Sequence, residues 1–360
     1  MESINITATC ACRSFAFDTD LPTSSLPRVR ALCLCTKCRR ISGGCGISYI
    51  TIDSAHLDLS KYNLTKYSSS DIADRYFCST CGCHVFVTRL SNDSWHLATG
   101  IWDRTEGIIE WTGCKWVEDT LDGGVSVWLK EIVDQDGSTK ALKRWMLPDR
   151  GGELVPEGTF ETLPKPSTNL EDQSTLKAQC ACGGVKFYIT RPDEASKALR
   201  SPFPDLMVPY HSGSSANPEN KTWWLCSNNT KYLAGLCTCT SCRQASGFEI
   251  QPWAFVPKCN IFQEDGSPLD FNMGTLKNYE SSAGVEREFC GVCGATVFWH
   301  CEERPDLIDV SIGLLDPNEG ARVEAWLHWW TNRVSFSEMA VSKSLVSSLE
   351  KGLKSWTQKD

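Results

Sequence analysis

The chain has 360 residues, a net charge of -8 and 41% hydrophobic residues. This length exceeds that of a usual single core and predicts about two domains. The acidic balance argues against nucleic acid as a partner, and no apolar run reaches the roughly 18 residues that span a bilayer. Because the N-terminal segment also lacks the basic and apolar regions of a secretory signal, we expect a soluble, cytoplasmic protein.

The first half carries three short cysteine motifs. They are a CxC motif at Cys10 and Cys12, a CxCxxC motif at Cys33, Cys35 and Cys38, and a CxxC motif at Cys78 and Cys81. Runs of β-branched and aromatic residues at 47–52 and 84–88 predict strands, and the CxxC motif lies in a turn before the second run. The first domain is expected over residues 1–150.

The second half repeats these motifs in the same order and with the same inner spacings. They lie at Cys180 and Cys182, at Cys237, Cys239 and Cys242, and at Cys290 and Cys293. In both halves a Phe precedes the CxxC motif, a Gly follows it and an Arg follows the CxCxxC motif. Strands are predicted at 184–190 and 295–299. The sequence therefore predicts two tandem copies of one domain.

The segments between and after these motifs set the remaining boundaries. Residues 151–175 have the Pro-rich composition of a linker, and the second domain is expected over 176–345. An insertion at about 192–230 reads as a long loop and favours the second copy as the more specialised one. Apolar residues at helical spacing predict a short C-terminal helix and tail at 346–360. We expect this helix to pack against its own domain, with a dimer contact as the alternative.

Cysteines at short fixed spacings in a reducing compartment indicate metal ligands, with secreted disulfides as the alternative. Zinc prefers a tetrahedral shell, so two cysteine pairs complete one closed, structural site. We predict two such sites, formed by Cys10, Cys12, Cys78 and Cys81 and by Cys180, Cys182, Cys290 and Cys293.

The middle motif offers three sulfurs and no obvious fourth ligand. A zinc ion held by Cys33, Cys35 and Cys38, or by Cys237, Cys239 and Cys242, would keep one open position, as catalytic zinc does. The prediction is two zinc ions per domain and up to four per chain. Two alternatives stay open. One is a metal-free redox motif, and the other is a shell closed by a spare cysteine, from Cys45, Cys83, Cys114, Cys226, Cys259 and Cys301.

The combined pattern of CxC, CxCxxCR followed by Ser-Gly, and FCxxCG resembles the glutathione-dependent formaldehyde-activating enzyme family, which includes the centromere protein V type domains. Arg75 and Arg287, three residues before Cys78 and Cys290, add to the resemblance. It implies a mainly β fold, a β-tent around zinc, in two tandem copies. It also implies a carbon-sulfur lyase activity that joins glutathione and formaldehyde into S-hydroxymethylglutathione. Leu34 and Thr238 depart from the family, which commonly has His there.

Two function classes follow from these observations. The first is an enzyme in which the open zinc binds a small-molecule thiol such as glutathione, or polarises an aldehyde. Arg39 and Arg243 are then tentative contacts to a substrate carboxylate, with balancing of thiolate charge as the alternative. His84 and His300 are proton shuttles or structural residues. The second class is a non-catalytic, zinc-stabilised binding or scaffold protein.

Overall fold

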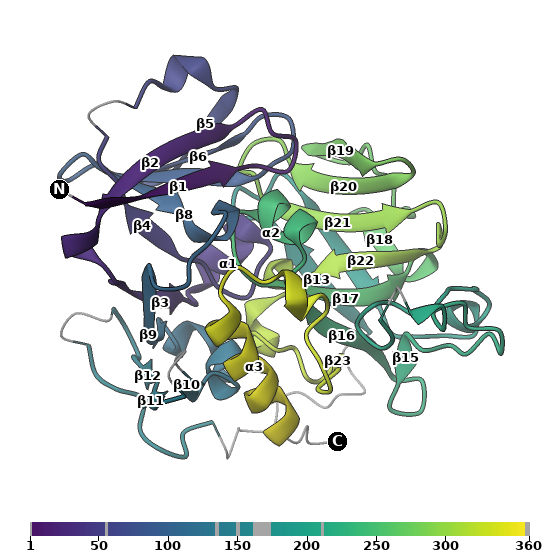
Figure 1. Cartoon of the computed structure of the whole chain (residues 1–360). Helices are drawn as coiled ribbons and strands as arrows, with labels where there is room; N and C mark the ends of the chain where they lie inside the picture. Colours follow the sequence, from purple (N-terminus) through teal and green to yellow (C-terminus); the bar gives the residue numbers. More distant parts are fainter. Residues whose placement is uncertain are drawn as a thin grey trace.

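The computed structural model describes residues 2–54, 57–133, 137–148, 152–160, 174–209 and 212–356. Its described part is mainly β, as predicted, and contains three α-helices, α1 (Thr36–Ser42), α2 (Thr240–Ser246) and α3 (Lys343–Ser355). The two halves of the chain lie side by side, with α1 and α2 between them (Figure 1). In the described residues, no helix is long and apolar enough to cross a membrane.

The first copy is built from small antiparallel sheets and one three-stranded sheet with two parallel pairings. A hairpin β1-β2 precedes a three-stranded sheet of order β12-β9-β3, a five-stranded sheet of order β4-β8-β7-β6-β5, and a pair β10-β11. The bounds are β1 (Ser3–Thr9), β2 (Ala16–Pro22), β3 (Arg28–Cys33), β4 (Tyr49–Thr51), β5 (Leu64–Ser70), β6 (Ala73–Cys78), β7 (His84–Arg89), β8 (Ser94–Ala98), β9 (Ile109–Lys115), β10 (Glu131–Val133), β11 (Thr139–Ala141) and β12 (Lys143–Arg144).

The second copy repeats this plan with a larger sheet. Strands β13, β14 and β18 form one sheet, and an eight-stranded sheet has the order β15-β16-β17-β22-β21-β20-β19, with β23 beside β16. The bounds are β13 (Thr175–Gln179), β14 (Lys186–Thr190), β15 (Leu225–Cys226), β16 (Lys231–Cys237), β17 (Gln251–Pro257), β18 (Ile261–Gln263), β19 (Leu276–Ser282), β20 (Val285–Cys290), β21 (Thr296–Cys301), β22 (Leu307–Ser311) and β23 (Leu327–Trp329). All four runs predicted as strands contain strands.

Each CxCxxC motif leads from a strand into a short helix. Strand β3 runs parallel to β9 and ends at Cys33, and β16 runs parallel to β23 and ends at Cys237. The next cysteine caps the following helix, because the Cys35 Sγ accepts the Cys38 N–H at 3.4 Å and the Cys239 Sγ accepts that of Cys242 at 3.3 Å. Three sulfurs are thereby brought together by one strand end and one helical turn.

The two copies are joined by backbone hydrogen bonds that occur in matching pairs. The N–H of Ala11, in the first CxC turn, donates to the carbonyl oxygen of Gln244 in α2 at 3.1 Å. Ala181 N–H, in the second CxC turn, donates to Arg40 O of α1 at 3.2 Å. The same parts of each copy thus contact each other, which is the pattern of a two-fold dimer interface within a single chain.

A glycine after each short helix permits this close approach. Gly43 and Gly247 have φ values of 73° and 92°, in the left-handed region. A Cβ on Gly43 would lie 2.1 Å from Thr296 O, and one on Gly247 would lie 2.3 Å from His84 O. Only glycine fits here, because any side chain would push the strand of the other copy away. This explains the glycine of the Ser-Gly pair that follows each CxCxxC motif.

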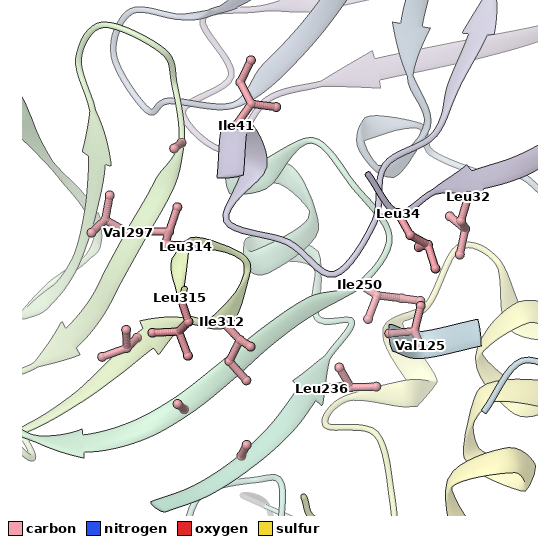
Figure 2. Packing of buried hydrophobic residues seen from close by; sticks show 14 of the residues in the cluster. Leu32, Leu34, Ile41, Val125, Leu236, Ile250, Val297, Ile312, Leu314 and Leu315 are labelled. Atoms are coloured by element: carbon pink, nitrogen blue, oxygen red, sulfur yellow. The ribbon is translucent and has the colours of Figure 1, made fainter. Parts of the chain in front are cut away.

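The hydrophobic core is continuous across the two copies. One cluster of buried residues includes Ile41 and Leu34 of the first copy together with Ile250 and Leu314 of the second. Figure 2 shows these side chains between the elements of both copies. The copies are therefore expected to stabilise each other. The predicted boundaries 1–150 and 176–345 stay predictions, and most of the predicted linker at 151–175 lies outside the described residues.

Helix α3 packs against its own domain, as expected, and also against the first copy. Ser348 Oγ accepts the N–H of Val133 in β10 at 3.2 Å, and the Trp356 and Trp128 rings lie 5.4 Å apart. Glu350 accepts the N–H of Val334 in the second copy at 2.8 Å. Spacing of apolar residues revealed a helix with one buried face, but not which copy covers it.

Candidate metal centres

Four cysteine sulfurs converge at each of the two predicted closed sites. The Sγ atoms lie within 4.8 Å of one another in the group of Cys10, Cys12, Cys78 and Cys81 and in the group of Cys180, Cys182, Cys290 and Cys293. The Cys12 Sγ is 3.4 Å from that of Cys10 and 3.5 Å from that of Cys78. Zinc–sulfur bonds of about 2.3 Å place tetrahedral sulfurs roughly 3.8 Å apart, whereas a disulfide bond is about 2.0 Å long. The spacing fits a metal shell.

Two turns far apart in the sequence supply each four-sulfur cluster. One is the CxC turn of the β1-β2 hairpin. The other is the turn between β6 and β7, where Gly82 has a φ of 76° and its N–H donates to Cys78 O at 2.9 Å. A metal in this cluster would therefore tie the hairpin to the five-stranded sheet.

Hydrogen bonds within each four-sulfur cluster favour the thiolate form of some of its cysteines. The pKa of the Cys12 thiol falls to about 6, chiefly because Cys81 donates to its sulfur, and Cys293 lowers the pKa of Cys182 to about 7 in the same way. The Ser14 hydroxyl lies 3.0 Å from the Cys12 Sγ. Thiolates are the form that binds metal, so the donor set suits a cation such as zinc.

Each closed cluster also lies next to the opposite copy. Burial raises the pKa of the Tyr67 hydroxyl, and negative charge at Cys293 and Cys182 of the second copy raises it further. The pKa of Tyr279 is raised by burial and by Cys81 of the first copy. Each metal site is thus part of the contact between copies.

Three sulfurs converge at each middle motif. The Sγ atoms lie within 4.8 Å of one another in the group of Cys33, Cys35 and Cys38 and in the group of Cys237, Cys239 and Cys242. Among the described residues, which include all six spare cysteines, no fourth His, Cys, Asp or Glu ligand joins either group. A tetrahedral metal held here would keep one position free for another ligand.

A buried arginine contacts the last sulfur of each three-cysteine group. Arg75 Nη2 donates to the Cys38 Sγ at 3.5 Å, and both Nη atoms of Arg287 donate to the Cys242 Sγ at 3.7 Å. Arg75 also donates to the Tyr49 hydroxyl at 3.0 Å. Hydrogen bonds from the two neighbouring cysteines lower the pKa of the Cys38 thiol, and Arg75 lowers it further.

These arginines would balance the charge of a metal shell formed by the three cysteines. Three thiolates and one divalent cation leave one negative charge in excess, and a single guanidinium cancels it. The sequence repeats Arg75 and Arg287 before the two FCxxCG motifs, but their role is visible only once β6 and β20 lie next to the helices. Sequence reasoning had assigned no function to either.

Arg39 and Arg243, the tentative substrate contacts, hold backbone atoms instead. Arg39 Nε donates to Leu34 O at 3.0 Å and Nη2 donates to Asp119 O at 2.9 Å. Arg243 Nη1 donates to Gly100 O of the first copy. Both side chains are buried, and burial lowers the pKa of both guanidinium groups. These contacts position α1 and join the copies, and a role in substrate binding stays a prediction.

The two candidate histidines are held by protein groups. His84 is fully buried, its Nε2 lies 2.7 Å from Ile41 O, and burial lowers its pKa to about 4. The ring of His300 stacks on Phe271 at 4.0 Å, and its Nε2 lies 3.2 Å from Glu288 Oε1. Both sets of contacts fit the structural interpretation.

Together these features define a duplicated cysteine-rich protein with two four-sulfur and two three-sulfur centres. A family model described as glutathione-dependent formaldehyde-activating enzyme matches residues 5–118 and 225–333. The chain therefore belongs to this family, in two tandem copies, as the resemblance implied. The second match begins after Cys180 and Cys182, which the structure nevertheless places beside Cys290 and Cys293. Comparisons with curated proteins and with solved structures give no match.

Proposed function

We propose that this protein is a zinc-dependent carbon-sulfur lyase that handles adducts of glutathione and aldehydes at its three-cysteine centres. The observation that carries the proposal is the incomplete ligand set, with three converging sulfurs and no fourth ligand among the described residues. The family membership supplies the substrate class. A reducing compartment such as the cytoplasm would keep the ligand cysteines as thiols.

Zinc bound at such a centre would lower the pKa of a coordinated thiol or polarise a carbonyl oxygen. The chain's own residues prepare this centre. Cys33, Cys35 and Cys38 fix three ligand positions. Hydrogen bonds from Cys33 and Cys35, assisted by Arg75, lower the pKa of Cys38 and favour its thiolate form. In the net reaction the glutathione sulfur forms a bond to the carbonyl carbon, the carbonyl electron pair moves to oxygen, and the thiol proton ends on that oxygen.

The proposed function includes up to four zinc ions per chain. The four-sulfur centres have no vacancy, so they are structural. They hold together the elements that carry the three-sulfur centres, because the CxC turn of each copy contacts the short helix of the other.

Exchange NMR tests the activity directly. Zinc-loaded protein is expected to accelerate the interconversion of glutathione plus formaldehyde with S-hydroxymethylglutathione over a protein-free control. We expect Cys38→Ser and Cys242→Ser to lower the catalysed rate of their own copy by about a hundredfold or more, since a missing ligand disrupts the centre. Loss of the whole acceleration in one variant would identify the working copy.

Cys259→Ser, which changes a spare, exposed cysteine, is the matched control and should retain full activity. An unaccelerated reaction with zinc fully bound would contradict the lyase proposal and favour the scaffold alternative. Full activity in both ligand variants would contradict the assignment of the centre.

A further inference from the structure

Different side chains pack around the two three-cysteine centres. Trp253, Trp299 and Phe336 pack around the second centre. At the first centre the packing residues include Tyr49, which the repeat aligns with Trp253, and Phe248, which comes from the second copy. Identical ligand motifs thus have different surroundings, and the difference lies in the aromatic residues.

Phe336 combines a half-buried side chain with an unusual backbone. Its φ is 53°, in the left-handed region that non-glycine residues rarely adopt. The segment is held against the metal motif, because Thr238 N–H donates to Ser335 O at 3.0 Å and Thr238 Oγ1 donates to Phe336 O at 3.2 Å. Thr238 lies between the ligands Cys237 and Cys239. Surrounding contacts must stabilise this conformation.

Asp205, from the insertion of the second copy, supplies those contacts. Its Oδ2 accepts hydrogen bonds from Phe336 N–H at 3.0 Å, Ser335 Oγ at 2.9 Å and Arg333 Nη2 at 3.2 Å. Asp205 is buried, with 9% of its surface exposed, so these charge-assisted bonds are shielded from water. The insertion is therefore connected, through the backbone of Phe336, to the residue whose ring packs on the second centre.

The first copy has a related aromatic residue without this connection. Trp116 directly follows β9 in the first copy, and Phe336 has the corresponding position after the segment beside β16. The φ of Trp116 is 59°, which is also in the left-handed region. Its N–H donates to Leu147 O at 3.1 Å rather than to a carboxylate. The first copy contains no counterpart of the 192–230 insertion. The carboxylate that holds the backbone of this aromatic residue is thus particular to the second copy.

We propose that Asp205 is a positioning residue that holds Phe336 as a gate over the second three-cysteine centre. The gate weakens the binding of large thiols such as glutathione at the vacant ligand position relative to compact thiols or aldehydes, whereas the first centre is not restricted in this way. The choice of a thiol or aldehyde as ligand rests on the proposed function. The gate itself rests on the contacts of Asp205 and Phe336.

Extraction of zinc by a coloured chelator tests the gate without any substrate. We compare the full-length, zinc-loaded chain with Asp205→Asn and with Phe336→Gly, which suits a positive φ and so limits the loss of stability. One zinc ion per chain is expected to leave about tenfold faster in both variants, which corresponds to a barrier lower by about 1.4 kcal/mol. Extraction of the other zinc ions should keep its rate.

Glu219→Gln is the matched control, because Glu219 is an exposed acid of the same insertion that pairs with Lys221. It should extract like the unchanged chain. Equal extraction rates in Asp205→Asn, Phe336→Gly and the unchanged chain would overturn the gate. Accelerated loss of all zinc ions would also overturn it, since it would indicate general destabilisation.

Cobalt-substituted protein then tests the selectivity. Spectral titrations with 2-mercaptoethanol and with glutathione report thiols that enter a vacant ligand position. Both variants are expected to bind glutathione about tenfold more tightly at one centre, with unchanged affinity for 2-mercaptoethanol. Unchanged glutathione affinity would overturn the selectivity. Faster zinc extraction without any thiol response would support the gate and contradict the proposed function.

Discussion

Cys290→Ser is expected to remove one zinc ion and to lower the melting temperature of the whole chain by about 10 °C or more. Cys290 is a fully buried member of the second four-sulfur cluster, and serine is a poor zinc ligand at this position. A structural zinc site contributes directly to the free energy of folding, so a loss of about 5 kcal/mol is reasonable for a chain of this size. Metal analysis and circular dichroism on the same sample measure both effects.

Because the two copies share an interface, loss of the zinc ion in one copy should also destabilise the other. Tyr67 of the first copy lies near the affected cluster, and the hydrophobic core includes residues of both copies. Both copies should therefore unfold together in one transition. Cys259→Ser, at an exposed cysteine outside the clusters, should retain four zinc ions and the original melting temperature. Separate transitions for the two copies in Cys290→Ser would contradict the shared interface.

Arg287→Met is expected to lower the free energy of unfolding by about 3–5 kcal/mol, because it leaves a buried thiolate charge uncompensated. Burial alone lowers the pKa of Arg287, but charge at Cys242 and Cys239 outweighs burial and raises it above the ordinary value. The affinity of the second three-cysteine centre for zinc should fall about 10- to 100-fold. Denaturant titration and competition with a zinc chelator measure the two quantities.

Two comparisons make the arginine result specific. Arg287→Lys keeps the charge and loses the contact through two nitrogens. Its stability and zinc affinity should therefore lie between those of Arg287→Met and the unchanged chain. Arg89→Met removes an exposed arginine at the end of β7 and should change neither quantity. If Arg287→Met changed neither stability nor zinc affinity, another group would have to compensate the charge at Cys242.

The cysteine groups that could hold metal could be predicted from the sequence because their members lie at short, repeated spacings. A CxC or CxxC pair fixes its own geometry within one turn, and duplication removed chance as an explanation. Pairing of the first and last motifs required only the tetrahedral preference of zinc. The structure places all fourteen predicted ligand cysteines in groups that fit this interpretation.

The contacts between copies could not be predicted, because they join residues far apart in the chain through backbone atoms. Gly43 and Gly247 were part of a recognisable motif, but their closeness to Thr296 O and His84 O depends on how the copies pack. The same limit applies to α3. The spacing of its apolar residues indicated a buried face. It did not indicate the contact with β10, whose residues are more than 200 positions away in the sequence.

The roles of the arginines could not be assigned from proximity in sequence. Arg39 directly follows the ligand Cys38, but neighbours on a helix point about 100° apart, so their side chains diverge. Arg75 is 37 residues from Cys38 and contacts its sulfur, because β6 lies beside α1 in the fold. An arginine next to the ligand motif in sequence therefore does not contact the ligand sulfur, whereas a buried arginine from a distant strand does.

X-ray absorption at the zinc edge, combined with metal analysis, tests the central claim most directly. Two four-sulfur and two three-sulfur centres predict four zinc ions per chain, with an average of about 3.5 sulfurs and 0.5 oxygens or nitrogens around each zinc. Added 2-mercaptoethanol should raise the sulfur average toward four, as this compact thiol fills the vacant positions. Four sulfurs around every zinc before any thiol is added, or only two zinc ions per chain, would contradict the open three-cysteine centres.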